Sequence, residues 1–282
     1  MKINLVDNGV FPITKDAEGN LLEGALDTGL SSPGTVQGEG KLLGTSCLFI
    51  RTSGCNLRCA WVGADGNGSP CDTPYSSHHP EKNMIEVDDV VKLVHANIGK
   101  MKHVVVSGGE PTMQQGLSEL LVKLQSLGLH TTIETNATIF NANIARYTNL
   151  VSMSPKLASS TPHQPNLKNT GIAYSEHWAR KHDAKRRNIE AIQQYIDYAI
   201  RYGNDFQLKF VVQNPMDIVE IETDFLAHLS GVAPDDVVLM PEGTSSDMLA
   251  DRSYWAIEAA VERGWRFTPR LHIELFGKAR AV

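Results

Sequence analysis

The sequence predicts an α/β fold, a partial and open βα barrel of about six units. Apolar, strand-like runs alternate with runs whose apolar residues recur three and four positions apart. Several predicted strands also end in polar residues, as expected at the active-site edge of a parallel sheet. A closed barrel typically needs about 250 residues of repeating units. Two long irregular stretches, 12–46 and 157–187, leave too little chain for that. A doubly wound sheet is the alternative.

The strands are expected where short apolar runs are bounded by polar residues. They cover residues 47–51, 103–107, 130–135, 151–154, 206–212, 237–241 and 266–275. Val90, Val94 and Ile98 lie at helical spacing and predict a helix over 88–100. Four more helices are expected over residues 117–128, 188–203, 217–231 and 246–264. The first two of these end in a glycine suited to a C-cap.

Composition limits the class of protein. The chain has 282 residues, 41% of them hydrophobic and 21% charged, as in ordinary soluble domains. It has no run of about eighteen apolar residues and no N-terminal signal segment, so we expect a cytoplasmic protein without a membrane span. The net charge of −6 gives no support for a nucleic-acid surface. The basic run 181–188 is short and is interpreted as a solvated face.

Three of the four cysteines, Cys55, Cys59 and Cys71, lie within seventeen positions in a loop rich in Gly and Asp. Cysteines in an intracellular chain indicate metal or redox chemistry. One reading is a structural zinc site completed by a histidine, for which His78 and His79 are nearby. The other is a [4Fe–4S] cluster, which is normally held by four thiolates, so that three leave one iron open. Cys47 lies in an apolar strand and is interpreted as core.

The stretches "CNLRC" and "CDTPY" resemble the cysteine motif of the radical S-adenosylmethionine (SAM) superfamily. The resemblance implies a [4Fe–4S] cluster held by three cysteines, with SAM chelating the fourth iron. One-electron reduction then cleaves the sulfonium to a 5′-deoxyadenosyl radical. The usual spacing is three residues and then two, whereas here the second gap is eleven. Residues 62–70 are read as an insertion, whose Gly, Asp and Asn can loop out without strain.

Further segments resemble the 7-carboxy-7-deazaguanine synthase family: "TVQGEG", "FIRTSGC", "SGGEP", "IETN", "MSPK", "LMPEG" and "PRLHIELFG". The likeness runs from about residue 35 onward. It implies one radical SAM domain over 1–282, with insertions near 12–32, 62–70 and 157–187. The implied reaction is a lyase-type ring contraction of 6-carboxy-5,6,7,8-tetrahydropterin to 7-carboxy-7-deazaguanine with loss of ammonia, in queuosine and other 7-deazapurine biosynthesis. Mg²⁺, a flavodoxin or ferredoxin as electron donor, and a homodimer are further implications.

The resemblance also assigns roles to residues. The cluster ligands and catalytic centre are Cys55, Cys59 and Cys71, and Thr73 is the Mg²⁺ ligand. The cofactor site comprises Pro70, Cys71, Asp72, Gly109, Glu110, Glu134, Thr135, Ser154, Pro155, Lys156, Met240, Pro241, Glu242 and Gly243. The substrate site comprises Val36, Gln37, Gly38, Glu39, Arg51, Ser107 and His272.

The residue types fit some of these roles. Arg51 ends an apolar strand, and its planar fork suits a carboxylate. Gln37 and Glu39 match the donor and acceptor edge of a pterin, and Glu110 can accept from an ammonium group. Simpler readings stay open: an Asp-Thr turn at Thr73, a plain strand-to-helix turn at "GGEP", and a structural role for His272.

Two other functions stay open at this stage. An enzyme that places a radical on a protein partner would keep the cluster and SAM, although "VQGEG", Arg51 and "CDTPY" together disfavour it. A zinc-binding interaction module would need no radical chemistry. Bound zinc would leave the protein colourless, whereas a cluster would make it brown.

Overall fold

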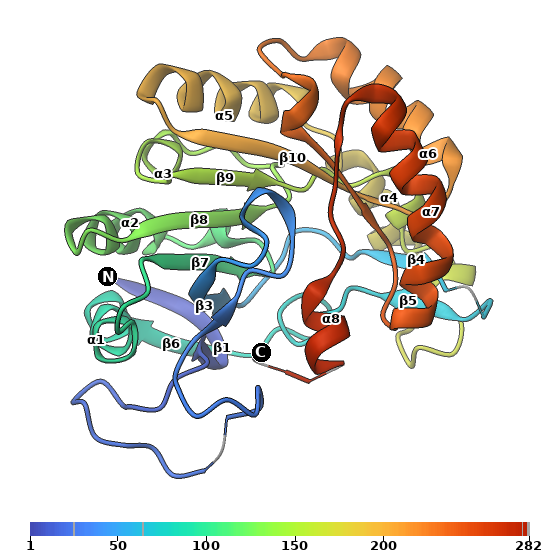
Figure 1. The fold of residues 1–282 in the computed structure, drawn as a ribbon. Helices are drawn as coiled ribbons and strands as arrows, with labels where there is room; N and C mark the ends of the chain where they lie inside the picture. Colours follow the sequence, from blue (N-terminus) through green and yellow to red (C-terminus); the bar gives the residue numbers. More distant parts are fainter. Residues whose placement is uncertain (25, 64, 278, 281–282) are drawn as a thin grey trace.

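The computed structural model describes residues 1–24, 26–63, 65–277 and 279–280 (Figure 1). Its centre is a ten-stranded sheet, ordered β12-β11-β10-β9-β8-β7-β3-β1-β6, with β2 paired to β3 at the side. The barrel strands are β3 (Ser46–Thr52), β7 (His103–Gly108), β8 (His130–Thr135), β9 (Leu150–Met153), β10 (Asp205–Val212), β11 (Val237–Pro241) and β12 (Arg266–Phe267). Each is parallel to its barrel neighbours. The predicted open α/β barrel is confirmed.

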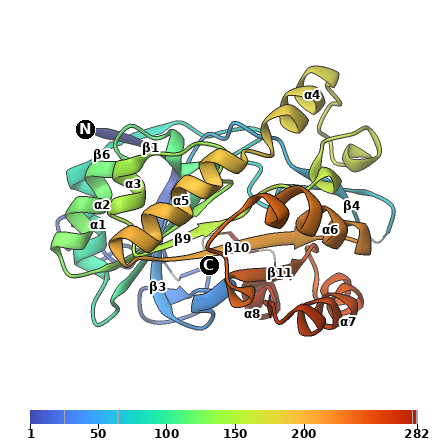
Figure 2. The same cartoon turned by 90° about the horizontal axis from the view of Figure 1, so that it is seen from above.

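The crossover helices lie on the outer face of this sheet (Figure 2). They are α1 (Val87–Asn97), α2 (Leu117–Ser126), α3 (Ala142–Arg146), α5 (Ile189–Tyr202), α6 (Pro215–Glu220) and α7 (Ser246–Arg263). Leu120, Leu121 and Leu124 of α2 are fully buried against the strands, in one continuous core. The predicted glycine stop after α5 is confirmed, since Gly203 caps the helix at a φ of 68°. Within the described residues, no helix is both long and apolar enough to cross a membrane.

Antiparallel strands extend the sheet beyond the barrel. β1 (Lys2–Phe11) pairs with both β3 and β6 (Asn83–Glu86). The sequence analysis did not predict β1. Its alternate residues Ile3 and Leu5 are buried, and a half-buried strand of this kind gives only a weak signal. The remaining strands are β2 (Thr35–Val36), β4 (Ala60–Val62) and β5 (Gly68–Pro70).

Two predicted elements are corrected by the structure. The strand expected over 266–275 is wrong, because β12 stops at Phe267 and α8 (Leu271–Phe276) follows. Pro269 has no N–H for a sheet ladder, which ends the strand there. The helix expected over 217–231 ends as α6 at Glu220 and continues as a π-helical turn and a 3-10 turn. Thr223 Oγ1 donates to the Val219 carbonyl there, a bond that often bends a helix.

The stretch 157–187 was expected to be irregular, which is also corrected. It contains α4 (Glu176–Lys185), whose N-terminus is capped by Ser175, and 3-10 turns at Ala158–Ser160 and Pro165–Leu167. In Figure 2, α4 projects at the edge of the molecule. The stretch 12–46 is largely irregular, as predicted, apart from β2 and a 3-10 turn at Gly40–Leu42.

Candidate active site

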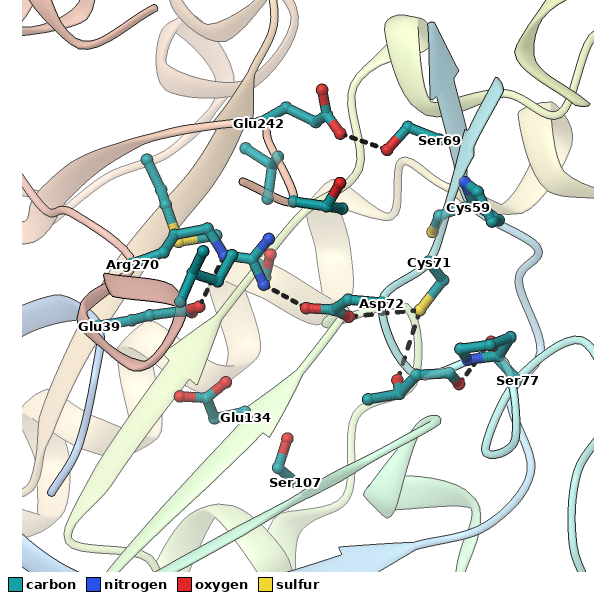
Figure 3. A pocket seen from close by; sticks show the side chains of 18 of the residues that line it. Glu39, Cys59, Ser69, Cys71, Asp72, Ser77, Ser107, Glu134, Glu242 and Arg270 are labelled. Carbon is teal, nitrogen blue, oxygen red and sulfur yellow. Dashed lines mark hydrogen bonds and ion pairs between the residues drawn. The ribbon is translucent and has the colours of Figure 1, made fainter. Parts of the chain in front are cut away.

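A cavity of about 790 Å³ opens at the carboxyl ends of the barrel strands. Its size is in the range of small-molecule sites. The strand register explains why its floor is polar. Arg51 of β3 pairs with Ser107 of β7, and Glu134 of β8 pairs with Ser152 of β9. Residues paired in register point to the same face. Ser107 and Glu134 accordingly lie side by side below the cysteine loop in Figure 3.

The insertion between Cys59 and Cys71 forms a hairpin. β4 and β5 pair antiparallel, with Ala60 opposite Pro70 and Val62 opposite Gly68. The Cys71 N–H donates to the Cys59 carbonyl at 3.0 Å, which continues the antiparallel hydrogen bonding to the base of the hairpin. The two cysteines are therefore neighbours in space, as Figure 3 shows, although eleven residues separate them in sequence. The inserted residues form a hairpin that extends away from the cysteines, so the insertion does not increase the separation of Cys59 and Cys71.

Side chains from distant elements fix this hairpin. Ser69 Oγ donates to Glu242 Oε1 at 2.7 Å, and Asn166 Nδ2 donates to the Ala60 carbonyl at 2.9 Å. The Val62 carbonyl accepts from Gln213 Nε2 and from Arg252 Nη2. The hairpin is thus held by side chains that lie far from it in sequence.

The three thiols lie in an apolar setting and are free. Leu57, Cys59 and Trp61 form a small buried cluster, against which Cys55 and Cys71 pack. Burial, and to a smaller extent the nearby Glu110, raises the pKa of Cys55 to about 12. Burial also raises the pKa of Cys59. Buried thiols with raised pKa values are inert as nucleophiles, but a bound metal reverses this preference by stabilising thiolates. The trio is therefore suited to ligation.

The surroundings fit an iron–sulfur cluster. Leu57 N–H donates to Cys55 Sγ at 3.4 Å, and Asn136 Nδ2 lies 3.9 Å from the same sulfur. Hydrogen bonds of this kind tune cluster potentials. Trp61 Nε1 is buried beside the cysteines without a partner in the described structure. No three His, Cys, Asp or Glu side chains within the described ranges converge tightly enough for a single metal ion. A cubane holds its thiolates farther apart than one ion does.

The two glycines of "SGGEP" pack against the cysteine strand. A Cβ on Gly108 would lie 2.1 Å from the Thr52 carbonyl oxygen, and one on Gly109 would lie 2.2 Å from the Gly54 carbonyl oxygen. The Glu110 N–H also donates to Gly54 O at 2.8 Å. Backbone thus meets backbone here, and this contact positions the loop before Cys55.

Replacing Gly109 by alanine should destabilise the protein by about 3 kcal/mol, because neither backbone can move away from the added methyl group. Gly128→Ala is the control, since its Cβ meets open space and only the φ of +71° is unfavourable, at about 1 kcal/mol. Urea unfolding of both variants measures the difference. A loss at Gly109 no larger than at Gly128 would contradict this packing.

A buried charge network lines the opposite wall. Lys209 of β10 is only 3% exposed, and its Nζ lies 2.6 Å from Glu39 Oε2 and 3.3 Å from Glu134 Oε2. Burial alone would lower the pKa of Lys209, but Glu134 and Glu39 raise it above its ordinary value. Burial alone would likewise raise the pKa of Glu39, but Lys209 and Arg270 hold it below its ordinary value. Lys209 and Glu39 are therefore both charged near neutral pH.

Arg270 connects this network to the cysteine loop (Figure 3). Its Nε lies 3.2 Å from Glu39 Oε1, its Nη2 contacts Asp72 Oδ2, and its Nη1 donates to the Gly243 carbonyl at 2.7 Å. His272 Nδ1 lies 3.8 Å from Glu39 Oε1. The wall thus presents carboxylates in fixed positions, each paired with a cation that also lines the cavity.

Most of the residues predicted for the site line this one cavity, including all seven assigned to the substrate and Thr73. Four assigned to the cofactor do not line it: Glu110, Pro155, Pro241 and Gly243. Glu110 is fully buried, and its carboxylate already accepts from Thr112, Thr135 and the Asn136 N–H. The expectation that this carboxylate receives an ammonium group is therefore corrected: it joins the β7 loop to the end of β8.

Two residues of the charge network were not predicted from the sequence. Lys209 lies within the apolar strand "FQLKFVV", where a lone cation is as unusual as Arg51 in its strand. Arg270 lies in the matched segment "PRLHIEL", but that segment was taken for a strand. Trp61 and Tyr75 also line the cavity and received no role. A search for charged residues inside apolar runs would have found Lys209.

Comparisons with known proteins now decide the family. A family profile described as the Radical SAM superfamily matches residues 49–221. A 7-carboxy-7-deazaguanine synthase from Halobacterium salinarum is 42% identical over 251 residues, which is 87% of this chain and 88% of the relative. One from Rhodopirellula baltica is 38% identical over 249 residues, 87% of this chain and 85% of the relative. The chain belongs to the radical SAM superfamily and, within it, to the 7-carboxy-7-deazaguanine synthase family.

A solved structure supports the fold of this radical SAM enzyme. The crystal structure of QueE from Escherichia coli aligns with a TM-score of 0.53 and 22% sequence identity, over 94% of this chain and 96% of that chain. Radical SAM enzymes use SAM and a [4Fe–4S] cluster. The alternative of a zinc-binding interaction module is therefore excluded.

Proposed function

We propose that this radical SAM enzyme converts 6-carboxy-5,6,7,8-tetrahydropterin into 7-carboxy-7-deazaguanine with release of ammonia, a step of 7-deazapurine biosynthesis. The observation that carries the proposal is the shared cavity. It brings three free thiols together with Arg51, whose buried Nε has no hydrogen-bond partner among the described residues, and with a wall of fixed carboxylates. The family's reaction needs these three features within reach of one another.

Cys55, Cys59 and Cys71 would hold the [4Fe–4S] cluster, and Gly109, Ser154 and Met240 would hold SAM beside it. When bound, this pair supplies a carbon-centred radical that removes a hydrogen atom from the substrate. The apolar packing of Leu57, Trp61 and Val211 around the cysteines keeps water from the reaction.

Arg51 is the proposed anchor of the substrate carboxylate. Its Nε is buried and lacks a hydrogen-bond partner in the described structure. A buried, unpaired guanidinium donor is costly, so the site favours an anionic ligand there. The guanidinium also lies 5.0 Å from the centre of the Phe11 ring, which holds the side chain in place.

The carboxylate wall is the proposed reader of the pterin ring. Glu39 Oε1 and Oε2 and Glu134 can accept from the ring N–H and amino groups, and Gln37 can donate to the ring carbonyl. Gln37 Nε2 already donates to Glu134 Oε1 at 3.1 Å, and Lys209 links Glu134 to Glu39, so the three side chains lie close together. Fixed acceptors of this kind reject a ring that lacks the matching donors.

Mg²⁺ would be bound at the edge of the cysteine loop. Thr73 Oγ1 lies 3.5 Å from Cys71 Sγ, and Asp72 carries a carboxylate on the same turn. Both line the cavity. Mg²⁺ prefers oxygen ligands and keeps several waters, so one or two protein groups and the substrate suffice. A flavodoxin or ferredoxin as electron donor, a homodimer and a cytoplasmic location belong to the same proposal.

Anaerobic reconstitution with iron and sulfide tests the function directly. The protein is then reduced and incubated with SAM, Mg²⁺ and the carboxylated tetrahydropterin, and the product is analysed by mass. We expect 7-carboxy-7-deazaguanine, with SAM regenerated. A protein that carries a full cluster and cleaves SAM but leaves the pterin unchanged would overturn the proposed substrate.

Arg51→Ala should weaken binding of the carboxylated pterin about 10- to 100-fold, because a charge-assisted hydrogen-bond pair contributes about 1.5–3 kcal/mol. The iron content should stay at its wild-type value. Arg51→Lys is the matched control. It keeps the charge but loses the planar fork, so its affinity for the pterin should lie between those of wild type and Arg51→Ala. Equal substrate affinity in all three proteins, measured by titration, would remove Arg51 from the site.

A further inference from the structure

Helix α4 is attached directly to the loop that carries Cys55 and Cys59. His182 of α4 is completely buried, and its Nδ1 accepts from the Arg58 N–H at 3.2 Å. Its Nε2 lies 3.2 Å from Ser160 Oγ. Burial lowers the pKa of His182 to about 3, so the ring is neutral and can accept at Nδ1. α4 therefore covers the cysteine loop from outside and keeps a fixed position on it.

A chain of contacts runs from the outer side of α4 to the cysteines. Arg58 Nη1 donates to the carbonyls of Cys55 and Leu57, each at 2.8 Å. The same guanidinium lies 4.2 Å from the centre of the Trp178 ring. Lys181 Nζ lies 4.3 Å from that ring centre. The half-buried Trp178 thus connects a surface cation to the loop that would hold the cluster.

The surface around Trp178 is basic, although the protein is acidic overall. Residues 168–187 carry six basic and two acidic side chains, a net charge of +4, whereas the whole chain carries −6. Arg180, Arg186 and Arg187 pair with carboxylates. Within the described part of the chain, no carboxylate forms an ion pair with Lys168, Lys181 or Lys185. Positive charge is therefore concentrated where α4 covers the cysteine loop.

We propose that this surface, the α4 face of Trp178, Lys181 and Lys185, docks an acidic one-electron carrier protein. The inference rests on the proposed function, because a cluster in the cysteine loop needs an electron from outside. One electron leaves the reduced carrier, which is oxidised, and enters the cluster, which is reduced, while no covalent bond forms or breaks. Opposite charges steer such partners together. The acidic remainder of the chain repels the same carrier, so docking is confined to this face.

The test uses a charge reversal with a matched control. Lys181→Glu/Lys185→Glu changes the α4 face, and Lys100→Glu/Lys102→Glu makes the same change of charge before β7, at the opposite end of the barrel. Two quantities are measured with flavodoxin. One is the Kd of oxidised flavodoxin for the cluster-free protein. The other is the rate at which flavodoxin hydroquinone bleaches the visible absorption of the reconstituted cluster.

At low ionic strength, we expect the α4 variant to bind flavodoxin about tenfold more weakly and its cluster to be reduced about tenfold more slowly. Both quantities should also depend much less on salt concentration than in the wild type. The control variant should stay within about twofold of wild type. Dithionite should reduce the clusters of all three proteins at similar rates, and thermal unfolding should show that all three fold.

An equal loss of flavodoxin binding and reduction rate in the control variant, or no loss of either in the α4 variant, would overturn the docking proposal. Retention of single-stranded RNA by wild type but not by the α4 variant, with flavodoxin reduction unchanged, would assign the face to nucleic acid instead. A wild-type cluster that flavodoxin reduces without any deazaguanine product would overturn the proposed substrate and leave the docking face standing.

Discussion

Replacing Cys55, Cys59 or Cys71 by alanine is expected to abolish assembly of the [4Fe–4S] cluster and all turnover, whereas Cys47→Ala leaves both in place. The three thiols pack around one apolar cluster at the cavity, so removing one leaves two irons without a protein ligand. Cys47 pairs in register with His103 at the opposite end of β3, where it is completely buried.

Iron and acid-labile sulfide are counted after anaerobic reconstitution of all four variants, together with the visible absorption. Cys47→Ala is the control for losing a buried thiol, and it should show a modest loss of stability only. A Cys71 variant with a full set of four irons, or a Cys47 variant without any, would overturn the assignment of ligands.

Lys209→Met is expected to lower the free energy of unfolding by about 3 kcal/mol and to weaken binding of the carboxylated pterin. Removing the ammonium leaves Glu39 and Glu134 in the cavity wall with a lost partner, and an uncompensated buried charge is strongly unfavourable. Lys92→Met is the matched control, since its pair with Asp89 is exposed and screened by solvent, so its loss should change stability little. Denaturant titration and substrate binding measure the two effects.

The pH dependence of this difference provides an independent check. In the native protein the pKa of Glu39 lies below its ordinary value of 4.5. Its ion pairs therefore stabilise the protein above pH 4.5, and this stabilisation is lost as the pH falls below that value. The gap between wild type and Lys209→Met should accordingly shrink on acidification. Lys209→Arg, which keeps the charge, should recover part of the stability at pH 7. A gap that widens in acid would contradict the network.

The fold was predictable where one periodicity dominated the sequence. β3, β7, β10 and β11 are short apolar runs, and the structure confirms each of them. Prediction of the element type failed where the pattern of apolar residues did not match the structure that forms. The run 266–275 alternates like a strand, but Pro269 ends the ladder and the residues that follow form α8. In 157–187 the charged composition hid α4, because its buried residues, Ala179 and His182, are not strongly apolar.

The site was predictable as a set of motifs but not as a geometry. The cysteines and "VQGEG" indicated candidate cluster ligands and a candidate substrate wall, and all of these residues that were assigned to the site line one cavity. No pattern could show that Glu110 would be saturated by Thr112, Thr135 and Asn136, because these bonds join separate loops. Nor could spacing show how Cys71 returns to Cys59.

That return has a consequence for recognising such proteins in genomes. A segment whose two halves pair with each other can gain or lose residues in pairs, while its two ends stay at the same separation. Distance along the chain is then no measure of distance between the sulfurs. A search pattern that demands a fixed short interval after the second cysteine would pass over this chain, whereas one that permits a self-paired excursion at that point would retain it.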